Sequence, residues 1–536
     1  MRAAPLTLGP DSWMTRADML RVALYPTACE IKTPPESADV LDHALARGAT
    51  VYGHSTGYGA LASFSSDSES PRHQMHLIAH LATGSGPPFD TRVARALTFD
   101  RLVTLSKGRS AAGAELLDYL SRLLATDAAP CIPRFGSVGA SGDLTPLAHL
   151  ATVMRGEGTY LPGRDPKLPP FQFARRDALA LVNGTSASTG LAVLGWWDVA
   201  ALVPLLIQSM ALMVGAQQLA RGAYAESLHT YRGQPGQTAI ATAMREALTS
   251  VENRSEPIDG AESSAHRLPT ADLHHEETLQ SAYSFRCIPQ VLGPTVEMLW
   301  HTGDTLEREI NAVTDNPVFE APDRVHHGGN FHGQVIAQAC DSLALGVANL
   351  SILLDRQIAR ITDPLLNHGL PPFLTGDSAG AHSGFMGAQV SATALTAELS
   401  ASAQRRYLLQ SRSTNGANQD VVSMSTLAGV ALYESLPRLR ELAAIHLLTA
   451  VQAAELAGIT AHPKLRGWIR RTSPFLTGDR ALSADIQNIA RGLSWITDRP
   501  EDGAPADRTF LGPPYPSIWK TLFPHTPDPT GITQQR

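Results

Sequence analysis

The feature that most restricts the fold is an uncharged segment, Val199–Leu219, with the sequence VAALVPLLIQSMALMVGAQQL. It is long enough to cross a lipid bilayer. However, it contains Pro204 together with glutamine and serine residues, and we find no second segment that matches it as a partner span. A helix that is apolar on all sides fits the core of a large helical protein better. We therefore expect a buried helix and no membrane partner.

Several further segments rich in Ala and Leu have apolar residues at intervals of three and four, which is typical of helices. Strand-like alternation is sparse, and alternating strand–helix–strand units are absent. The predicted fold class is therefore all-α. The polar stretch Arg221–Leu273 is predicted to be a long connection or an exposed edge. The other segments with helical periodicity are Ala114–Ala125, Pro289–Val313, Gln334–Ile361 and Leu436–Gly458.

The composition excludes several classes of function. There are 43 basic and 50 acidic side chains, a net charge of −7, and no basic run that could contact nucleic-acid phosphates. The cysteines, Cys29, Cys131, Cys287 and Cys340, include no C-x-x-C pair, which argues against a disulfide framework or a zinc knuckle. Residues 1–13 lack the apolar core of a signal peptide. We expect a cytoplasmic protein with no nucleic-acid partner.

The glycine-rich island SVGASGDLTPL (Ser137–Leu147) can carry unusual chemistry. Gly139 and Gly142 permit a tight backbone reversal, which could bring the Gly142 nitrogen onto the carbonyl carbon of Ala140. Ring closure, with loss of water from the ring and from the Ser141 side chain, would leave an exocyclic methylidene group, a strong electrophile. From these residues alone, an ordinary turn before a helix is the simpler interpretation.

Seven further motifs accompany this island between residues 51 and 424. In chain order the eight are VYGHSTGYG (Val51–Gly59), HLATGSG (His80–Gly86), GASGDLTPLAH (Gly139–His149), LVNGTSA (Leu181–Ala187), QSAYSFRCIPQVLG (Gln280–Gly293), TDNPVF (Thr314–Phe319), HGGNFHG (His327–Gly333) and STNGANQDVVSM (Ser413–Met424). Together they resemble the aromatic amino acid ammonia-lyase and aminomutase family. The resemblance implies 4-methylideneimidazole-5-one formed from Ala140, Ser141 and Gly142, with no metal and no external cofactor.

The reaction that the resemblance implies is the β-elimination of ammonia from an aromatic L-amino acid, which gives the trans-arylacrylate. The β-proton is barely acidic and an amine is a poor leaving group, so an electrophile that captures the amine does the work of a cofactor. The resemblance implies that Tyr52 is the base that takes the β-proton. Because a phenol needs a lowered pKa for this role, we expect positive dipoles or helix N-termini near Tyr52.

The family's substrate-binding residues carry over to several motifs. Gln280, Tyr283 and Arg286 follow at three-residue steps, and would share one face if the segment is helical. The resemblance implies that Arg286 binds the substrate carboxylate through its planar guanidinium and that Tyr283 stands close to the prosthetic ring. Gln280 would hydrogen-bond near the ligand. The remaining implied site residues are Asn183 (carboxylate or prosthetic carbonyl), Phe331 (ring-stacking wall), and Asn330, Asn415 and Gln419 (polar lining).

His80 and Leu81 stand where the family's substrate choice is encoded, and a His-Leu pair resembles the tyrosine-selecting one. Histidine can hydrogen-bond the para-hydroxyl group, whereas its buried nitrogen would stay unpaired against phenylalanine. Asn415 does not separate tyrosine lyases from aminomutases. The implied function is conversion of L-tyrosine to trans-p-coumarate. The alternatives are tyrosine 2,3-aminomutase, which makes β-tyrosine, and phenylalanine or histidine ammonia-lyase. His54 and Tyr58 depart from the family pattern and leave the substrate less defined than the reaction.

Three other interpretations compete with this one. His73, His76 and His80 fall on one helical face, but no Glu follows His76 as in H-E-x-x-H, so we expect no metal. The motifs at Gly53–Gly57 and His327–Asn330 are similar to parts of a serine hydrolase. In those enzymes the HGG loop precedes the nucleophile, and the required strands are missing here. A non-catalytic helical scaffold would not explain why the glycine-rich segments contain so many Tyr, Arg, Asn and Gln residues.

The resemblance also implies how the chain is organised and assembled. Residues 1–215 would form a mixed, mainly helical domain that carries the prosthetic-group loop. Residues 216–536 would form a central bundle of long antiparallel helices with a C-terminal tail. The implied assembly is a homotetramer in which three subunits contribute to each active site, and a charged fraction of only 17% fits large subunit contacts.

Overall fold

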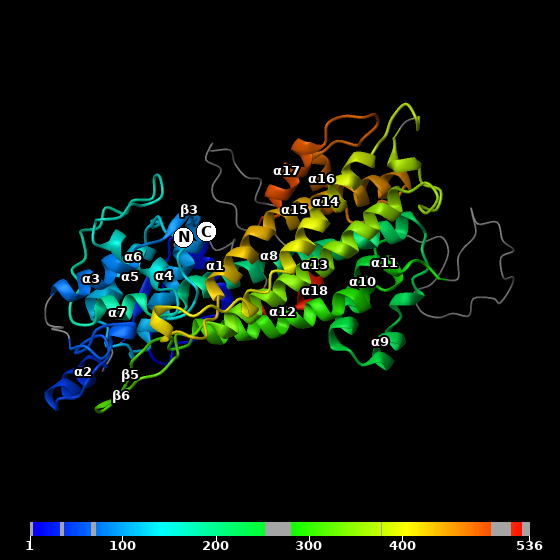
Figure 1. Ribbon diagram of the computed structural model, residues 1–536. Helices are drawn as coiled ribbons and strands as arrows, with labels where there is room; N and C mark the ends of the chain where they lie inside the picture. The colour runs from blue at the N-terminus through cyan, green and yellow to red at the C-terminus, as the bar shows by residue number, and fades with distance from the viewer. Residues whose placement is uncertain are drawn as a thin grey trace.

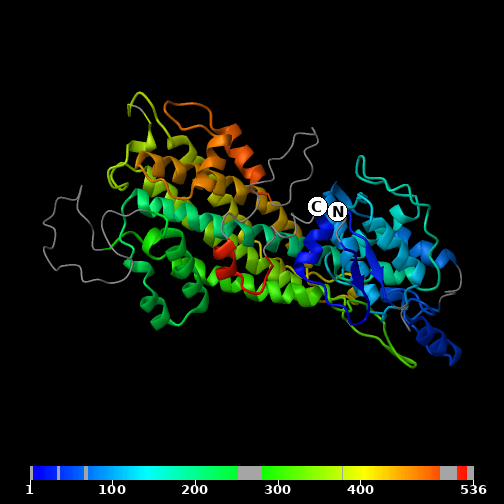
Figure 2. The same cartoon turned by 180° about the vertical axis from the view of Figure 1, so that it is seen from behind.

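The computed structural model describes residues 4–32, 37–65, 71–251, 280–376, 378–494 and 516–527. Most of the described chain is helical, and its strands are short and paired two by two, which confirms the all-α class. Figure 1 shows the elements that precede α8 gathered at one end, with the long helices extending away from them. Figure 2 shows the same arrangement from behind.

The described elements are mostly short near the N-terminus, and the longest helices come later in the chain. In order they are β1 (Leu6–Leu8), α1 (Arg16–Leu24), β2 (Cys29–Ile31), α2 (Ser37–Ala46), α3 (Pro71–Leu81), β3 (Ser85–Pro88), α4 (Thr91–Ser106), α5 (Ala114–Leu124), β4 (Pro133–Phe135), α6 (Leu144–Met154), α7 (Asp177–Val182), α8 (Ser186–Ala216), α9 (Glu226–Arg232), α10 (Pro235–Leu248), α11 (Tyr283–Arg286), α12 (Ile288–Ile310), β5 (Val318–Glu320), β6 (Arg324–His326), α13 (Gln334–Thr362), α14 (Met386–Ala403), α15 (Ser425–Leu456), α16 (Pro463–Thr472), α17 (Ser483–Gly492) and α18 (Pro516–Leu522).

Two details correct the sequence predictions. β1 and β2 pair in parallel, with Leu6 opposite Cys29, and α1 lies between them in the chain. The chain therefore contains one strand–helix–strand unit, whose three-residue strands are too short to show a period-two pattern. The stretch predicted as a connection contains α9 and α10, and α10 buries Ile240, Met244 and Leu248. Its part from residue 252 onward lies outside the described residues.

Residues 199–216 of the uncharged segment lie in α8, every residue of which is buried, and the last three residues of the segment follow the helix. In the described chain, two helices are long and apolar enough to cross a membrane by length and composition alone, namely α8 and α13. We expected only one such segment. The most apolar part of α8 is wholly covered by the protein, mainly by α15 and α4. Burial among other helices therefore accounts for its lack of charge.

The long helices form the predicted antiparallel bundle. Asn349 donates to the Val291 carbonyl, while Gln357, further along α13, donates to the Ser284 carbonyl, which precedes α12. The order of these contacts shows that α12 and α13 run in opposite directions. The hydrogen bonds between α13 and α14 follow the same reversed order. The packing of neighbouring helices in this way confirms the bundle.

Three of the long helices nevertheless point the same way. Asp198 of α8 pairs with Arg440 of α15 at 2.8 Å, and further along both helices Ser209 lies 2.9 Å from His446. α8 and α15 are therefore parallel. α13 also begins and ends beside α15. The N-termini of α8, α13 and α15 consequently lie at the same end of the bundle. The domain division at residue 215 stays a prediction, since α8 packs against both α4 and α15.

Candidate functional site

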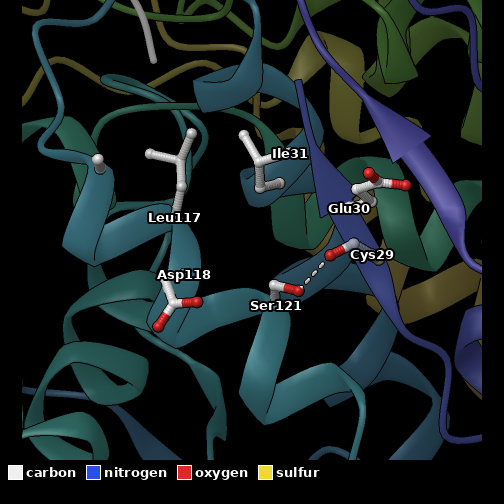
Figure 3. A pocket seen from close by; sticks show the side chains of 7 residues that line it. Cys29, Glu30, Ile31, Leu117, Asp118 and Ser121 are labelled. Atoms are coloured by element: carbon white, nitrogen blue, oxygen red, sulfur yellow. Dashed lines mark hydrogen bonds between the residues drawn. The ribbon is translucent and has the colours of Figure 1, made fainter. Parts of the chain in front are cut away.

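A surface hollow between β2 and α5 does not have the chemistry of a catalytic site (Figure 3). Burial raises the pKa of the Cys29 thiol to about 12, so the thiolate nucleophile is scarce at neutral pH. The Ser121 hydroxyl donates to the Cys29 carbonyl at 2.5 Å. The hollow has a volume of about 400 Å³ and is lined by Cys29, Glu30, Ile31, Ala114, Leu117, Asp118 and Ser121, none of which is a predicted site residue.

The loop that carries Ala140, Ser141 and Gly142 has the glycine conformations that the predicted backbone reversal requires. Gly139 and Gly142 have φ angles of +67° and +68°, in the left-handed region that favours glycine. A side chain at Gly142 would also collide with the neighbouring Gly184, because its Cβ would lie 2.2 Å from the Gly184 carbonyl oxygen. Local conformation and close packing therefore both require glycine here.

Asp143 ties this loop to two long helices. Its buried carboxylate accepts hydrogen bonds from the Ser188 backbone N–H at 2.7 Å, the Ser188 hydroxyl at 2.9 Å, the Ser137 hydroxyl at 3.2 Å and the Thr426 hydroxyl. Burial raises the pKa of Asp143, and these hydrogen bonds oppose the rise because they favour the charged form. Ser188 lies in the first turn of α8 and Thr426 in the first turn of α15.

Four helices begin around the loop. α6 starts directly after it, and α8 and α15 bind Asp143 as described above. α13 begins beside α15, since a Cβ on Gly333 would lie 2.3 Å from the Ser425 hydroxyl oxygen. The Ser423 hydroxyl, just before α15, donates to the Gly139 carbonyl at 2.8 Å. Helix N-termini carry partial positive charge, so this end of the bundle favours negative charge that develops near Ser141.

A continuous series of contacts joins Ser141 to Tyr52. The Gln419 side-chain amide donates to the Ser141 hydroxyl at 2.7 Å. Gln419 lies in the same turn as Asn415, whose side chain packs so closely on Gly59 that a Cβ there would be 2.1 Å from Asn415 Nδ2. The Gly59 backbone N–H then donates to the Tyr52 hydroxyl oxygen at 2.8 Å. The fold thus brings together four predicted site residues from motifs far apart in the sequence.

The pKa of Tyr52 differs from the expectation. Burial raises it, while the hydrogen bond from the Gly59 N–H and the positive charge of Arg176 act to lower it. The positive groups expected near Tyr52 are therefore present, but in this chain the burial of the phenol outweighs them. The Tyr52 backbone N–H also donates to Nε2 of His327 at 3.2 Å.

Asn183 is held beside the loop by Asp315 and by the backbone of Asn316. Its amide donates to Asp315 at 3.0 Å and to the Asn316 carbonyl at 2.9 Å. Asp315 forms a fully buried ion pair with Arg176 at 3.0 Å, and Arg176 also donates to the Asn316 carbonyl at 2.7 Å. Asp315 belongs to the motif TDNPVF, so its position in that motif is the signal that could have identified it.

These residues fit a prosthetic ring made from the Ala-Ser-Gly loop. Gly139 and Gly142 have the left-handed conformation expected for a tight reversal, and the Ser141 side chain that would lose water is half-buried beside Gln419. The side-chain oxygen of Asn183 is buried without a hydrogen-bond partner among the described residues. Buried acceptors are normally paired, so this oxygen can accept a hydrogen bond from a bound N–H or O–H donor.

His80 and Leu81 lie at the end of α3. Leu81 packs half-buried against the core, whereas His80 is exposed, with its Nδ1 3.0 Å from the His76 carbonyl. A carbonyl only accepts, so Nδ1 is the donor in this contact and Nε2 is the nitrogen left to accept in that tautomer. Tyr58 stacks on His73, with ring centroids 4.8 Å apart, and lies 6.5 Å from the His80 ring.

The competing interpretations find little support. Within the described part of the chain no group of three His, Cys, Asp or Glu side chains is arranged to hold a metal ion. The Ser55 hydroxyl lies 3.3 Å from the Val51 carbonyl, to which it donates, and accepts from the Val51 N–H. Ser55 lies among turns, not between a strand and a helix as a hydrolase nucleophile does.

The remaining predicted residues lie in two places, the loop before α13 and the segment around α11. Phe331 is half-buried in the loop before α13, and Asn330 donates to the Val313 carbonyl at 3.3 Å. Gln280 precedes α11 and does not share its face, because α11 spans only Tyr283–Arg286. α11 lies at the opposite end of the molecule from α6 and α7 (Figure 1).

Tyr283 and Arg286 nevertheless form a compact pair. The Arg286 guanidinium carbon lies 4.6 Å from the centre of the Tyr283 ring. Glu309 follows Arg286 by 23 positions and lies near the far end of α12, where it accepts from the Thr185 hydroxyl beside the Ala140–Gly142 loop. At 1.5 Å per residue the separation is about 35 Å, so one chain cannot place Arg286 and Ser141 on the same small molecule.

Comparison with known protein sequences finds relatives over most of the chain. The profile described as aromatic amino acid lyase matches residues 15–471. The tyrosine ammonia-lyase of Cereibacter sphaeroides is 41% identical over 496 residues, which cover 88% of this chain and 93% of that protein. The histidine ammonia-lyase of Salmonella choleraesuis is 35% identical, covering 91% of this chain and 96% of that protein.

Solved structures show the same fold. The tyrosine aminomutase of Streptomyces globisporus superposes with a TM-score of 0.83 at 30% identity, over 92% of this chain and 97% of that one. The phenylalanine aminomutase of Pantoea agglomerans gives a TM-score of 0.85 at 28% identity, over 91% of this chain and 99% of that one. The family profile and the extent of these relatives show that the chain belongs to the aromatic amino acid lyase family.

Proposed function

We propose that this enzyme is a tyrosine ammonia-lyase that eliminates ammonia from L-tyrosine to give trans-p-coumarate. The observation that carries the proposal is the series of contacts from Ser141 through Gln419 and Asn415 to Tyr52, surrounded by four helix N-termini. The proposal is supported because these contacts join Tyr52, a candidate proton acceptor, to the Ala-Ser-Gly loop. The similarity to a tyrosine ammonia-lyase over most of both chains supports the choice of substrate.

The proposed prosthetic group is 4-methylideneimidazole-5-one, formed from Ala140, Ser141 and Gly142. When present, it supplies an electrophile that improves the amine as a leaving group. Gln419 and Asp143 hold the loop in place, as described above. The helix N-termini around the loop stabilise negative charge, and the unpaired oxygen of Asn183 accepts a hydrogen bond from the substrate amine.

Tyr52 is proposed to take the β-proton of the substrate. The acceptor is its phenolate oxygen, which the Gly59 N–H and the charge of Arg176 stabilise. Because burial raises the pKa of Tyr52 overall, the phenolate is a small fraction of the enzyme at neutral pH, and this fraction grows tenfold per pH unit below the pKa.

The base role predicts the pH dependence. We expect kcat, measured at saturating L-tyrosine, to rise from pH 7 into the alkaline range, and Tyr52→Phe to remove almost all of this activity. Saturating substrate is used so that ionisation of the free amino acid does not contribute to the profile. A kcat that is independent of pH between 7 and 9, or a Tyr52→Phe variant with normal kcat, would contradict the assignment.

His80 is proposed to select tyrosine. Since Nδ1 donates to the His76 carbonyl, Nε2 is the ring nitrogen that can accept a hydrogen bond from a phenolic O–H. We expect His80→Phe to change the ratio of kcat/KM for L-tyrosine over L-phenylalanine by roughly a hundredfold toward phenylalanine, because the hydroxyl then loses its partner. His76→Phe, on the same exposed side of α3, is the control and should leave the ratio within a few-fold of the wild type. Equal ratios in the two variants would disprove the role of His80.

The site is proposed to be completed by other copies of the chain in a homotetramer. Tyr283 and Arg286 lie too far from Ser141 in their own chain to share a substrate with it. α13 and α14 also leave large apolar side chains exposed, among them Val335, Leu345, Ile352 and Val390, which fits contact with further subunits. Light scattering coupled to size exclusion should give the mass of four chains, and a monomer that turns over would contradict the shared site.

Tyrosine 2,3-aminomutase is the second candidate, because the superposed solved structures described above are aminomutases. An aminomutase retains the arylacrylate and returns ammonia to the β-carbon. Chromatography of the products from L-tyrosine separates the two functions. Accumulation of p-coumarate without β-tyrosine supports the lyase, and β-tyrosine as the main early product supports the aminomutase.

A further inference from the structure

The orientation of α11 depends on contacts from outside the helix. A helix of four residues is too short to be stable by itself. Phe285 is buried, Arg286 is half-buried and Tyr283 is 70% exposed. The turn is thus anchored on one side and presents its Tyr-Arg pair on the other.

Two buried side chains bind the inner carbonyls of this turn. Gln357 of α13 donates through its side-chain N–H to the Ser284 carbonyl at 2.7 Å. The Tyr224 hydroxyl donates to the Phe285 carbonyl at 2.8 Å. In a continuous helix the Phe285 carbonyl would accept from the residue four positions later, but that residue is Pro289, which has no N–H. Tyr224 supplies the missing donor.

Gln357 is itself held by a buried polar chain. Because its N–H₂ group faces the Ser284 carbonyl, its side-chain oxygen faces His446 Nε2 at 2.8 Å and must accept from it. His446 then bears its proton on Nε2, and Nδ1 accepts from the Ser209 hydroxyl at 2.9 Å. The hydroxyl proton of Ser209 therefore goes to His446 and not to the Leu206 carbonyl, which lies 2.8 Å from the same oxygen.

This chain has one possible direction of hydrogen bonding. Ser209, His446 and Gln357 are all fully buried, and burial lowers the pKa of His446 to about 3, so the imidazole is neutral at working pH. A neutral ring with a fixed tautomer determines which end of the Gln357 amide faces α11. The amide could not rotate by half a turn without placing two oxygens against each other.

The polar chain is not needed to hold the helices together. Buried amide, imidazole and hydroxyl groups lose their hydration on folding, and apolar side chains of the same volume commonly stabilise such a junction equally well. What apolar side chains cannot do is bind a specific carbonyl. The chain crosses from α8 through α15 and α13 and ends on the backbone of α11, between the two residues proposed to meet the substrate.

We propose that Gln357 and Tyr224 are positioning residues that fix the Tyr283–Arg286 turn for binding the substrate carboxylate, and that His446 and Ser209 act through Gln357. This inference rests on the proposed function, because it takes Arg286 as the carboxylate-binding residue. Gln357 and Tyr224 hold the same turn through two separate hydrogen bonds. Loss of either donor should misplace Arg286 while leaving its charge in the protein.

The test compares two inhibitors of the tyrosine reaction in the full-length enzyme. One is 3-(4-hydroxyphenyl)propanoate, which has a carboxylate, and the other is 4-ethylphenol, which has none. We expect Gln357→Met and Tyr224→Phe each to raise the inhibition constant of the carboxylate inhibitor roughly tenfold. Misalignment of a binding group has effects of this size or larger. The inhibition constant for 4-ethylphenol should change less than twofold. In the Arg286→Lys background, Gln357→Met should have no further effect on the carboxylate inhibitor.

Asn349→Leu is the matched control. Asn349 also lies on α13 and donates to a backbone carbonyl at 2.8 Å, but its partner is Val291 of α12 and not α11. The Asn349→Leu variant should lower the melting temperature as Gln357→Met does, and it should leave both inhibition constants unchanged. Tyr224→Phe removes a single oxygen, so it tests the inference even if Gln357→Met does not fold.

The outcomes separate this inference from the proposed function. A wild-type enzyme that is inactive on L-tyrosine overturns both. An active wild type in which Tyr224→Phe or Gln357→Met behaves as Asn349→Leu does overturns the inference alone. An equal weakening of both inhibitors would show a general loss of structure and would also overturn it.

Discussion

Ser141→Ala is expected to abolish turnover of every aromatic amino acid while the fold remains intact. The hydroxyl of Ser141 is the group whose loss would create the methylidene electrophile, and alanine has no hydroxyl to lose. In the structure this hydroxyl accepts one hydrogen bond, from Gln419, so its removal should cost only about 1 kcal/mol of stability. We expect loss of nearly all kcat, with a melting temperature within a few degrees of the wild type.

Intact mass gives a second measurement that is independent of activity. Ring formation removes two water molecules, so the wild-type chain should weigh less than its sequence by that amount, and Ser141→Ala should not show this deficit. Ser55→Ala is the control, since the Ser55 hydroxyl contacts only the Val51 backbone in the described chain, and it should keep the deficit. An active Ser141→Ala variant, or a wild-type chain of full sequence mass, would contradict the prosthetic-group proposal.

Mixing two inactive variants is expected to restore activity if subunits share sites. Arg286→Ala should lower kcat/KM for L-tyrosine strongly, because the substrate carboxylate loses a bidentate partner. Ser141→Ala chains lack the electrophile. If a site takes Ser141 from one chain and Arg286 from another, random mixing leaves both intact in about a quarter of the sites. Co-expression of the two variants should therefore recover a comparable fraction of wild-type activity.

The control for this experiment is a pair of residues that one chain brings together. Tyr52 and Ser141 are joined by contacts within a single chain, through Gly59, Asn415 and Gln419. Co-expression of Ser141→Ala with Tyr52→Phe should therefore restore nothing. If the Arg286→Ala mixture also stays inactive although mixed tetramers form, each site is built from one chain and the shared-site proposal is wrong.

The long helices were predictable because their burial leaves a clear mark on the sequence. Each predicted helical segment lies largely within a helix of the structure. However, α8 and α15 begin earlier than their apolar runs, at Ser186 and Ser425 beside the Ala140–Gly142 loop. α10 was missed because it lies within a stretch that is polar as a whole, although eight of its fourteen residues are buried. β1 and β2 were missed because three residues are too few to show alternation.

The site could be predicted only in part. The family resemblance identified Tyr52, Ser141 and Gln419, and the structure brings these together. The resemblance did not indicate the buried ion pair of Arg176 with Asp315, because a pair 139 residues apart is recognised only once the chain has folded. The rise in the pKa of Tyr52 was missed for the same reason, since burial depends on tertiary packing.

The most direct test of the central claim is a single incubation series. The purified protein is mixed separately with L-tyrosine, L-phenylalanine and L-histidine, and the arylacrylate is followed by ultraviolet absorbance while released ammonia is measured in the same sample. We predict that L-tyrosine gives trans-p-coumarate and ammonia in equal amounts, faster than the other two substrates react. If none of the three amino acids yields an arylacrylate or a β-amino acid, this chain is not an aromatic amino acid ammonia-lyase.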